Sequence, residues 1–180
     1  MQRTITNPFV KDKVTFLKTF NGSGGTITEV EVYLMPGGGT PMHFHRSYAE
    51  TFMAGTGILG LELSGGRKVY LKPGEMFTVP KTVKHRFFND NDEAVTFRTI
   101  ISPGHIGFEY SLRIAYGLAN DGLTNNRSIP KSFLHLAVLM KMGDSNLTGI
   151  LTLLKPFVNF LNKKAIRKGI DQILIDRYCS

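Results

Sequence analysis

The chain has 180 residues, of which 42% are hydrophobic and 20% are charged. This size and apolar content suit one ordinary domain with an appended segment, and no low-complexity tract or internal repeat is visible. The net charge of +8 is uneven: residues 111–180 carry ten Lys/Arg against four Asp/Glu, and residues 1–110 carry 12 against 10. The basic character therefore belongs to the C-terminal part and says little about what the rest of the chain binds.

Two features of the sequence indicate the cellular compartment in which the protein is expected. Met1–Lys13 contains no apolar core segment, so we expect no secretory signal. The single cysteine, Cys179, cannot form a disulfide within the chain. Both features favour a cytoplasmic, reducing compartment.

The first two thirds of the chain are predicted to form short strands. Residues 1–12 are expected to be a leading arm, and a glycine-rich hairpin turn over 21–25 separates the first two strands. The expected strands cover residues 14–20, 26–35, 51–54, 58–63, 68–71, 75–79, 85–88 and 94–101. Short strands at regular spacing, punctuated by Gly and Pro, are typical of an antiparallel barrel or sandwich.

Potential metal ligands gather in residues 37–57. His43 and His45 are two positions apart, so on an extended backbone both imidazoles face the same side. A turn over 47–49 could return Glu50 to that space, and His85 is a fourth candidate from a later strand. Imidazole and carboxylate together suit zinc, iron, manganese, nickel or copper.

The two histidine-bearing stretches resemble the paired motifs of the cupin family, and the resemblance covers roughly residues 13–110. The first motif is matched by Gly37, His43, His45, Glu50 and Gly57, and the second by Gly74, Pro80, His85 and Asn89. Thr82 stands where the second motif has a glycine. Threonine is β-branched and resists a positive φ, which leaves open a turn of a different type without affecting a ligand.

The resemblance implies a fold and a metal site. The expected fold class is mainly β: a cupin-type double-stranded β-helix, or jelly-roll barrel, over 1–110, with a helical extension over 111–180. His43, His45, Glu50 and His85 would hold one divalent ion, and the resemblance leaves Fe, Mn, Zn and Ni open. Cupin glutamates also serve as a base in some members, which is a second role for Glu50.

Strand parity suggests a pocket wall beside the ligands. Phe52 shares the parity of Glu50 and Phe87 that of His85, while Phe77, Tyr33 and Met35 are weaker candidates. Such a wall would favour a small, partly apolar organic ligand. Any one of these residues, taken alone, is better explained as filling the barrel.

The C-terminal part reads as helical after residues 105–119, which fit either a last barrel segment or a first helix. Helical spacing covers 132–142 and 166–178, with a break over 143–146. The apolar run 147–161 is interrupted by Lys155-Pro156, where we expect a kink or stop.

The sequence suggests three kinds of contact for this helical extension: protein packing, a membrane surface and nucleic acid. We favour packing on the barrel or on a second subunit, with a homodimer as the expected assembly. Contact with a membrane surface is the less favoured alternative: Lys163, Lys164, Arg167 and Lys168 lie beside the apolar run, which is too short to span a bilayer. No nucleic-acid-binding motif is present, so we expect no nucleic-acid partner.

Function divides into three hypotheses. The favoured hypothesis is a metalloenzyme that acts on a small organic molecule with dioxygenase- or isomerase-like chemistry. Of the enzyme classes, we favour a metal-dependent oxidoreductase. The other hypotheses are a non-catalytic ligand-sensing module and a structural metal site in an interaction or membrane-associated protein. The fold alone does not choose between them, and no second catalytic group stands out in the sequence.

Overall fold

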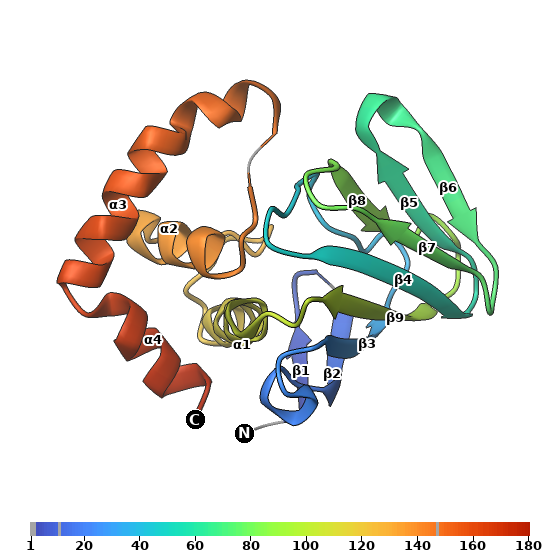
Figure 1. Cartoon of the computed structure of the whole chain (residues 1–180), viewed down its shortest axis with the longest axis horizontal. Coiled ribbons are helices and arrows are strands. Elements are labelled where there is room, and N and C mark those ends of the chain that lie inside the picture. The colour runs from blue at the N-terminus through green and yellow to red at the C-terminus, as the bar shows by residue number, and fades with distance from the viewer. Residues whose placement is uncertain (1–2, 11, 147) are drawn as a thin grey trace.

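The computed structural model describes residues 3–10, 12–146 and 148–180, and it contains two antiparallel sheets followed by helices (Figure 1). This arrangement confirms the predicted fold class, mainly β with C-terminal helices. Leu147, where the second apolar run begins, lies outside the described residues.

Nine described strands make the two sheets. The larger sheet has the order β1 (Thr4–Asn7), β2 (Asp12–Lys18), β3 (Thr28–Leu34), β9 (Val95–Ser102), β4 (Ala49–Thr56) and β7 (Met76–Val79). The smaller sheet has the order β6 (Lys68–Leu71), β5 (Leu59–Leu63) and β8 (His85–Phe88). Within residues 1–12, which were expected to be a leading arm, Thr4–Asn7 forms β1 and pairs with β2 at the edge of the larger sheet.

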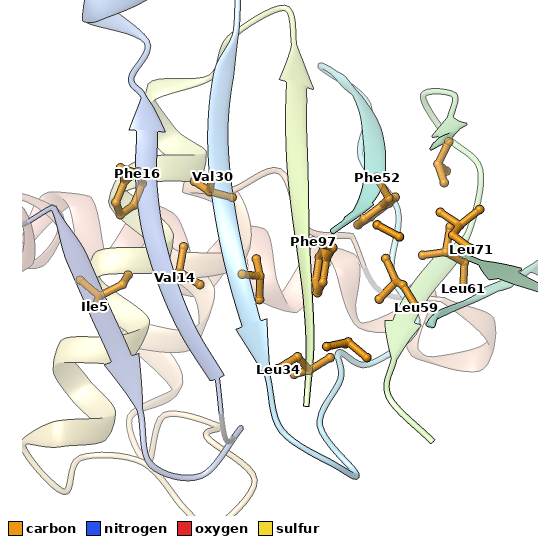
Figure 2. Close-up of a cluster of buried hydrophobic side chains, with 14 of the residues drawn as sticks. Ile5, Val14, Phe16, Val30, Leu34, Phe52, Leu59, Leu61, Leu71 and Phe97 are labelled. Atoms are coloured by element: carbon orange, nitrogen blue, oxygen red, sulfur yellow. The ribbon is translucent and has the colours of Figure 1, made fainter. Parts of the chain in front are cut away.

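Alternate residues of the strands face one another to form the barrel core (Figure 2). Val30 and Leu34 of β3, Phe97 of β9, and Leu59 and Leu61 of β5 are all buried there. Each such side chain contributes about 1.5–3 kcal/mol when it leaves water. The interior is therefore a packed apolar layer that fixes the positions of the polar side chains at its rim.

Two residues predicted to line a pocket lie on the outside of the barrel. Tyr33 is 39% exposed and Met35 is 43% exposed, and they alternate with buried Val32 and Leu34. The Nζ atom of Lys13 lies 5.4 Å from the centre of the Tyr33 ring. The prediction for Tyr33 and Met35 is wrong because both share the parity of Glu29 and Glu31, on the side of the strand opposite to buried Val32 and Leu34.

The helices follow directly. They are α1 (Ile106–Asn120), α2 (Phe133–Met142), α3 (Lys155–Arg167) and α4 (Ile170–Tyr178), with a short 3-10 helix over Gly149–Leu154 before α3. The segment 105–119 therefore belongs to the helical part. Helix α1 begins at Ile106, five residues before residue 111, where the helical extension was expected to start. Pro156 lies in the first turn of α3, where a missing N–H costs nothing, so it starts a helix there.

Helix α1 joins the barrel to the other helices. Its residues Leu112 and Tyr116 pack against the barrel core, whereas Ile114 and Leu118 pack in a second cluster. That second cluster comprises Ile114, Leu118, Val138, Leu139, Ala165, Leu174 and Cys179. Figure 1 shows α1 next to the sheet and α3 at the outer edge of the molecule.

Among the described residues, no helix combines the length and the apolar content needed to cross a bilayer.

Candidate metal centre

Four side chains from three parts of the chain converge at one end of the barrel. His43 and His45 precede β4, Glu50 lies on β4, and His85 begins β8. Their ligand atoms all lie within 4.8 Å of one another. The backbones of His43 and His85 hold each other in place through two hydrogen bonds, N to O, of 2.9 and 2.8 Å. The predicted convergence of these four residues is therefore confirmed.

Backbone carbonyls orient all three imidazoles. The Nδ1–H groups of His43, His45 and His85 donate to the carbonyl oxygens of Pro41, Asp144 and Val83, at 2.8, 3.1 and 3.0 Å. A donor at Nδ1 turns Nε2 towards the shared centre and fixes the ring plane, which is how proteins prepare histidine to bind a metal.

The Glu50 carboxylate lies between two of these rings. Its Oε2 atom is 2.6 Å from Nε2 of His85 and 3.4 Å from Nε2 of His45. Burial alone would raise the pKa of Glu50, but its interactions with the neighbouring His45 and His85 outweigh it and hold the pKa below its ordinary value. The carboxylate is therefore ionised at neutral pH.

The pKa values of His43 and His85 are also shifted by their surroundings in this cluster. Burial lowers the pKa of His43 to about 4, although the charge of Glu50 opposes it. Burial also works to lower the pKa of His85, but its hydrogen bond to Glu50 reverses the effect and raises the pKa. A cation entering this centre meets a neutral His43 and displaces a proton held between His85 and Glu50.

One atom of the cluster lacks a hydrogen-bond partner. Among the described residues nothing accepts from or donates to Nε2 of His45, although the atom is buried. A buried polar atom left unpaired costs about 1–3 kcal/mol, and a metal ion at the shared centre would pair with it. Three imidazole nitrogens and one carboxylate oxygen also match the donor preferences of iron, manganese, zinc and nickel. The residues present therefore fit a divalent ion.

The loop that follows α2 supports the first two ligands. Besides the Asp144 carbonyl on His45, the Asp144 carboxylate accepts the backbone N–H groups of Arg46 and Ser47, each at 2.6 Å. The N–H of Asn146 donates to the carbonyl of Phe44 at 3.0 Å. We refer to residues 143–146 as the support loop. The sequence indicated only a helix break here, although Asp and Asn at a break often bind neighbouring backbone groups.

Tyr48 is a second residue that the motif analysis missed. Its ring stacks on His45 at a centroid distance of 4.4 Å, and its hydroxyl donates to the carbonyl of Gly143 at 2.8 Å. Burial, and then the charges of Glu50 and Asp144, raise the pKa of Tyr48 well above its ordinary value, so it remains a donor. Its position between His45 and Glu50 was the available signal, because an aromatic residue there must pack beside the ligands.

The three phenylalanines proposed as a pocket wall lie on the inner side of their strands. The Phe52 ring is 6.0 Å from the His85 ring and 6.1 Å from the Phe87 ring. Phe77 faces Phe52 in the β4–β7 register and packs against the barrel core. These three residues therefore remain candidates, whereas Tyr33 and Met35 do not.

Thr82 occupies the motif turn in an unusual conformation. Its φ is +68°, and its N–H donates to the carbonyl of His45 at 2.6 Å. The turn thus keeps the positive φ that the motif glycine would supply, so a turn of a different type is ruled out. A left-handed backbone costs a residue other than glycine about 1–2 kcal/mol. Because the Thr82 N–H bonds to the His45 carbonyl, this strained turn also helps to position a candidate metal ligand.

Comparisons with known proteins agree with this arrangement. Residues 30–101 match the family model described as Cupin domain. A stretch of 97 residues, 51% of the chain, is 34% identical to a protein of Aspergillus clavatus described as "Probable oxidoreductase patJ", of which it covers 30%. The chain thus spans about a third of the length of that curated relative.

Solved structures show lower identity. The polyketide cyclase RemF from Streptomyces resistomycificus is 24% identical with a TM-score of 0.47, over 51% of this chain and 65% of that one. KdgF from a Halomonas species is 18% identical with a TM-score of 0.47, over 55% and 86% of the two chains. A predicted oxalate decarboxylase from Thermotoga maritima is 17% identical with a TM-score of 0.48, over 51% and 80%.

Proposed function

Because this chain belongs to the cupin superfamily, we propose that it is a metal-dependent enzyme that acts on a small organic molecule. The observation that carries the proposal is the convergence of His43, His45, Glu50 and His85 within 4.8 Å. Buried groups of this kind are expensive to gather unless they share a partner, and a divalent ion is the partner that fits them.

The proposed chemistry follows from the donor set. A divalent ion held by three neutral imidazoles and one carboxylate would supply a Lewis acid with coordination positions left for a substrate oxygen or dioxygen. Dioxygenase-like oxidation is the reaction class we place first, and isomerase-like chemistry second. The description of the Aspergillus relative as a probable oxidoreductase supports this order, on the stretch that the two proteins share.

Glu50 is better suited to binding the ion than to removing a proton. Its carboxylate already pairs with His45 and His85, and its pKa lies below its ordinary value. A base with a depressed pKa has little driving force to take a proton. We therefore assign Glu50 as a ligand, in preference to the base role that the family resemblance also offered.

The apolar wall of the centre indicates the kind of substrate. Phe52 is buried beside His85, with Phe87 and Phe77 next to it. These rings would exclude water from one side of the ion and accept an apolar part of the ligand. A small organic molecule with one oxygen-bearing end and one apolar end fits this description.

A non-catalytic, ligand-sensing role is the second candidate, and the support loop is the observation that favours it. A change at His45 would reach α2 through the Asp144 carbonyl. The homodimer and the cytoplasmic location predicted from the sequence remain predictions.

Reloading experiments separate the two candidates. Chelator-treated protein would be loaded in turn with Fe²⁺, Mn²⁺, Ni²⁺ and Zn²⁺, then assayed for dioxygen uptake and substrate loss against phenols, thiols and diketones. We expect turnover with one of these metals and at least a ~100-fold loss in Glu50→Gln, with Asp92→Asn in an exposed loop as the control. Ligand binding without turnover in every loaded form would favour the sensing role, and neither binding nor turnover would contradict both.

A further inference from the structure

The outer side of the C-terminal helices exposes large apolar residues. Ile150 and Leu153 of the 3-10 helix are 80% and 76% exposed, and Phe157 and Phe160 of α3 are 54% and 56% exposed. Scattered single apolar residues on a surface are ordinary, but a contiguous group of them marks a contact site. These four residues lie within the short segment 150–160, and we call them the outer apolar stripe.

The stripe lies on the side of α3 that the protein does not use for its own packing. Ala165 of α3 is fully buried in the helical cluster, and Val158 and Leu161 are partly buried. Phe157, Phe160, Lys164 and Arg167 recur at spacings of three and four residues, so they share a different face. Along that exposed face the N-terminal half is apolar and the C-terminal half is basic.

The charge around the stripe has one sign. Residues 145–170 contain five cations, which are Lys155, Lys163, Lys164, Arg167 and Lys168, and no Asp or Glu. All five are exposed, and within the described part of the chain none of them is in an ion pair with a carboxylate. The partner that complements this surface must therefore offer negative charge beside an apolar phase.

We propose that the outer face of α3 and its preceding 3-10 helix docks on an anionic phospholipid surface. Phe157, Phe160 and the apolar residues before them would enter the boundary between headgroups and acyl chains, while Lys163, Lys164 and Arg167 would lie on the phosphates. An amphipathic helix with bulky apolar residues and a basic polar region binds membranes in this orientation, parallel to the surface. The chain stays peripheral, because no described helix is long and apolar enough to cross the bilayer.

The position of α3 in the fold permits this contact. Figure 1 shows α3 at the edge of the molecule farthest from the β6 end of the barrel, with α1 and α2 between it and the sheets. Ile173 of α4 is also exposed, at 61%. A flat bilayer can therefore meet α3 without touching the metal centre.

Charge argues against a second copy of the chain as the occupant. A two-fold contact would pair this face with itself, and residues 145–170 offer no carboxylate to the cations of the other copy. An anionic lipid surface instead neutralises each cation that reaches it, and each contributes to binding separately.

Vesicle co-sedimentation of the full chain tests the proposal without metal or substrate, so its outcome is independent of the proposed enzyme function. The probes are vesicles of phosphatidylcholine alone and vesicles with about 30% phosphatidylglycerol, at about 0.1 M and 0.5 M NaCl. We expect at least ~10-fold stronger partitioning into the anionic vesicles at low salt, with most of that preference lost at high salt.

Two variants and two matched controls locate the contact. Phe157→Ser/Phe160→Ser and Lys163→Gln/Lys164→Gln/Arg167→Gln should each weaken binding by ~10-fold or more. The controls remove equivalent exposed groups from the barrel: Ile58→Ser/Met76→Ser, and Lys18→Gln/Arg67→Gln/Lys72→Gln. These should change binding less than about twofold.

Three results would overturn the proposal. The first is equal partitioning into both kinds of vesicle, and the second is equal weakening by the controls. The third is a concentration-dependent dimer in sedimentation velocity that Phe157→Ser/Phe160→Ser converts to monomer while vesicle binding is absent. Near-ultraviolet circular dichroism of each variant confirms that the fold is retained.

Discussion

Two regions of this molecule, the metal centre and the outer face of α3, differ in how their polar and apolar groups are paired. At the metal centre, Nδ1 of each histidine has a backbone partner and the Nε2 atoms gather at one point. On the outer face of α3, Phe157 and Phe160 lie in solvent beside cations that have no carboxylate partner among the described residues. The first region gathers donor atoms that fit an ion, whereas the second leaves apolar and basic side chains in solvent.

The comparison also divides the helices. Helix α1 and the support loop after α2 are integrated with the barrel, through Tyr116 on Asp12 and through Asp144 on His45. Helix α3 packs on α2 and α4, and its Ala165 is buried in the helical cluster. The helical extension is therefore part of the metal centre on one side and a free surface on the other.

The largest predicted contrast is between two apolar truncations. Leu118→Ala in α1 removes a fully buried side chain and should lower the free energy of unfolding by about 2–5 kcal/mol. Phe157→Ala removes an exposed ring and should change it by less than about 0.5 kcal/mol. Urea denaturation of both variants measures this, and equal losses would show that the outer face of α3 is covered within the chain itself.

The pH dependence of the free energy of unfolding tests the contact between α1 and the barrel, which Tyr116 makes with Asp12. Burial raises the pKa of Asp12 from 3.8 to about 6, although the hydrogen bond from Tyr116 opposes it. The folded state then binds the proton more tightly than the unfolded state, so stability falls as the pH rises from about 4 to about 6. Two pKa units correspond to about 3 kcal/mol.

The matched variant for that profile is Asp12→Asn, which keeps an acceptor for Tyr116 but does not titrate. The difference in unfolding free energy between wild type and variant should shift in favour of the variant across this pH interval. A difference that stays constant with pH would contradict the account of a protonated, buried Asp12.

The support loop predicts a smaller effect on metal affinity. Asp144→Ala removes the acceptor for Arg46 and Ser47, which should let the His45 segment move and weaken metal binding by about 10–100-fold. Asp144→Asn keeps an acceptor and tolerates the positive φ of 49° at this position, so it should restore most of the affinity.

Titration calorimetry on chelator-treated protein measures both variants, with Asp92→Ala in an exposed loop as the control. Unchanged affinity in Asp144→Ala would mean that the helical extension is independent of the centre.

The smallest predicted effect concerns Thr82. Thr82→Gly should raise the unfolding free energy by about 1 kcal/mol, because glycine adopts a φ of +68° without steric cost. Thr78→Gly on β7 has no such strain to relieve and should be destabilising by a similar amount. If both substitutions destabilise equally, the threonine turn is not strained.

The sequence was sufficient for the barrel and the four candidate ligands because both depend on local spacing. His43 and His45 share a face at any strand position, and Glu50 and His85 follow from motif register. Tyr33 and Met35 were misplaced although the signal was present, since they share the parity of Glu29 and Glu31, and a strand face that carries two carboxylates turns away from an apolar core. The support loop is about a hundred residues from His45 in sequence, so no local pattern could reveal their contact.

The central claim is that His43, His45, Glu50 and His85 hold one divalent ion, and metal content tests it most directly. Protein purified without a histidine tag should contain about one equivalent of a divalent transition metal per chain by elemental mass spectrometry. His45→Ala should lose that metal on dialysis while its circular dichroism still shows a folded barrel. Wild-type protein that binds no metal even when supplied with it, or a His45→Ala variant that retains the full equivalent, would contradict the claim.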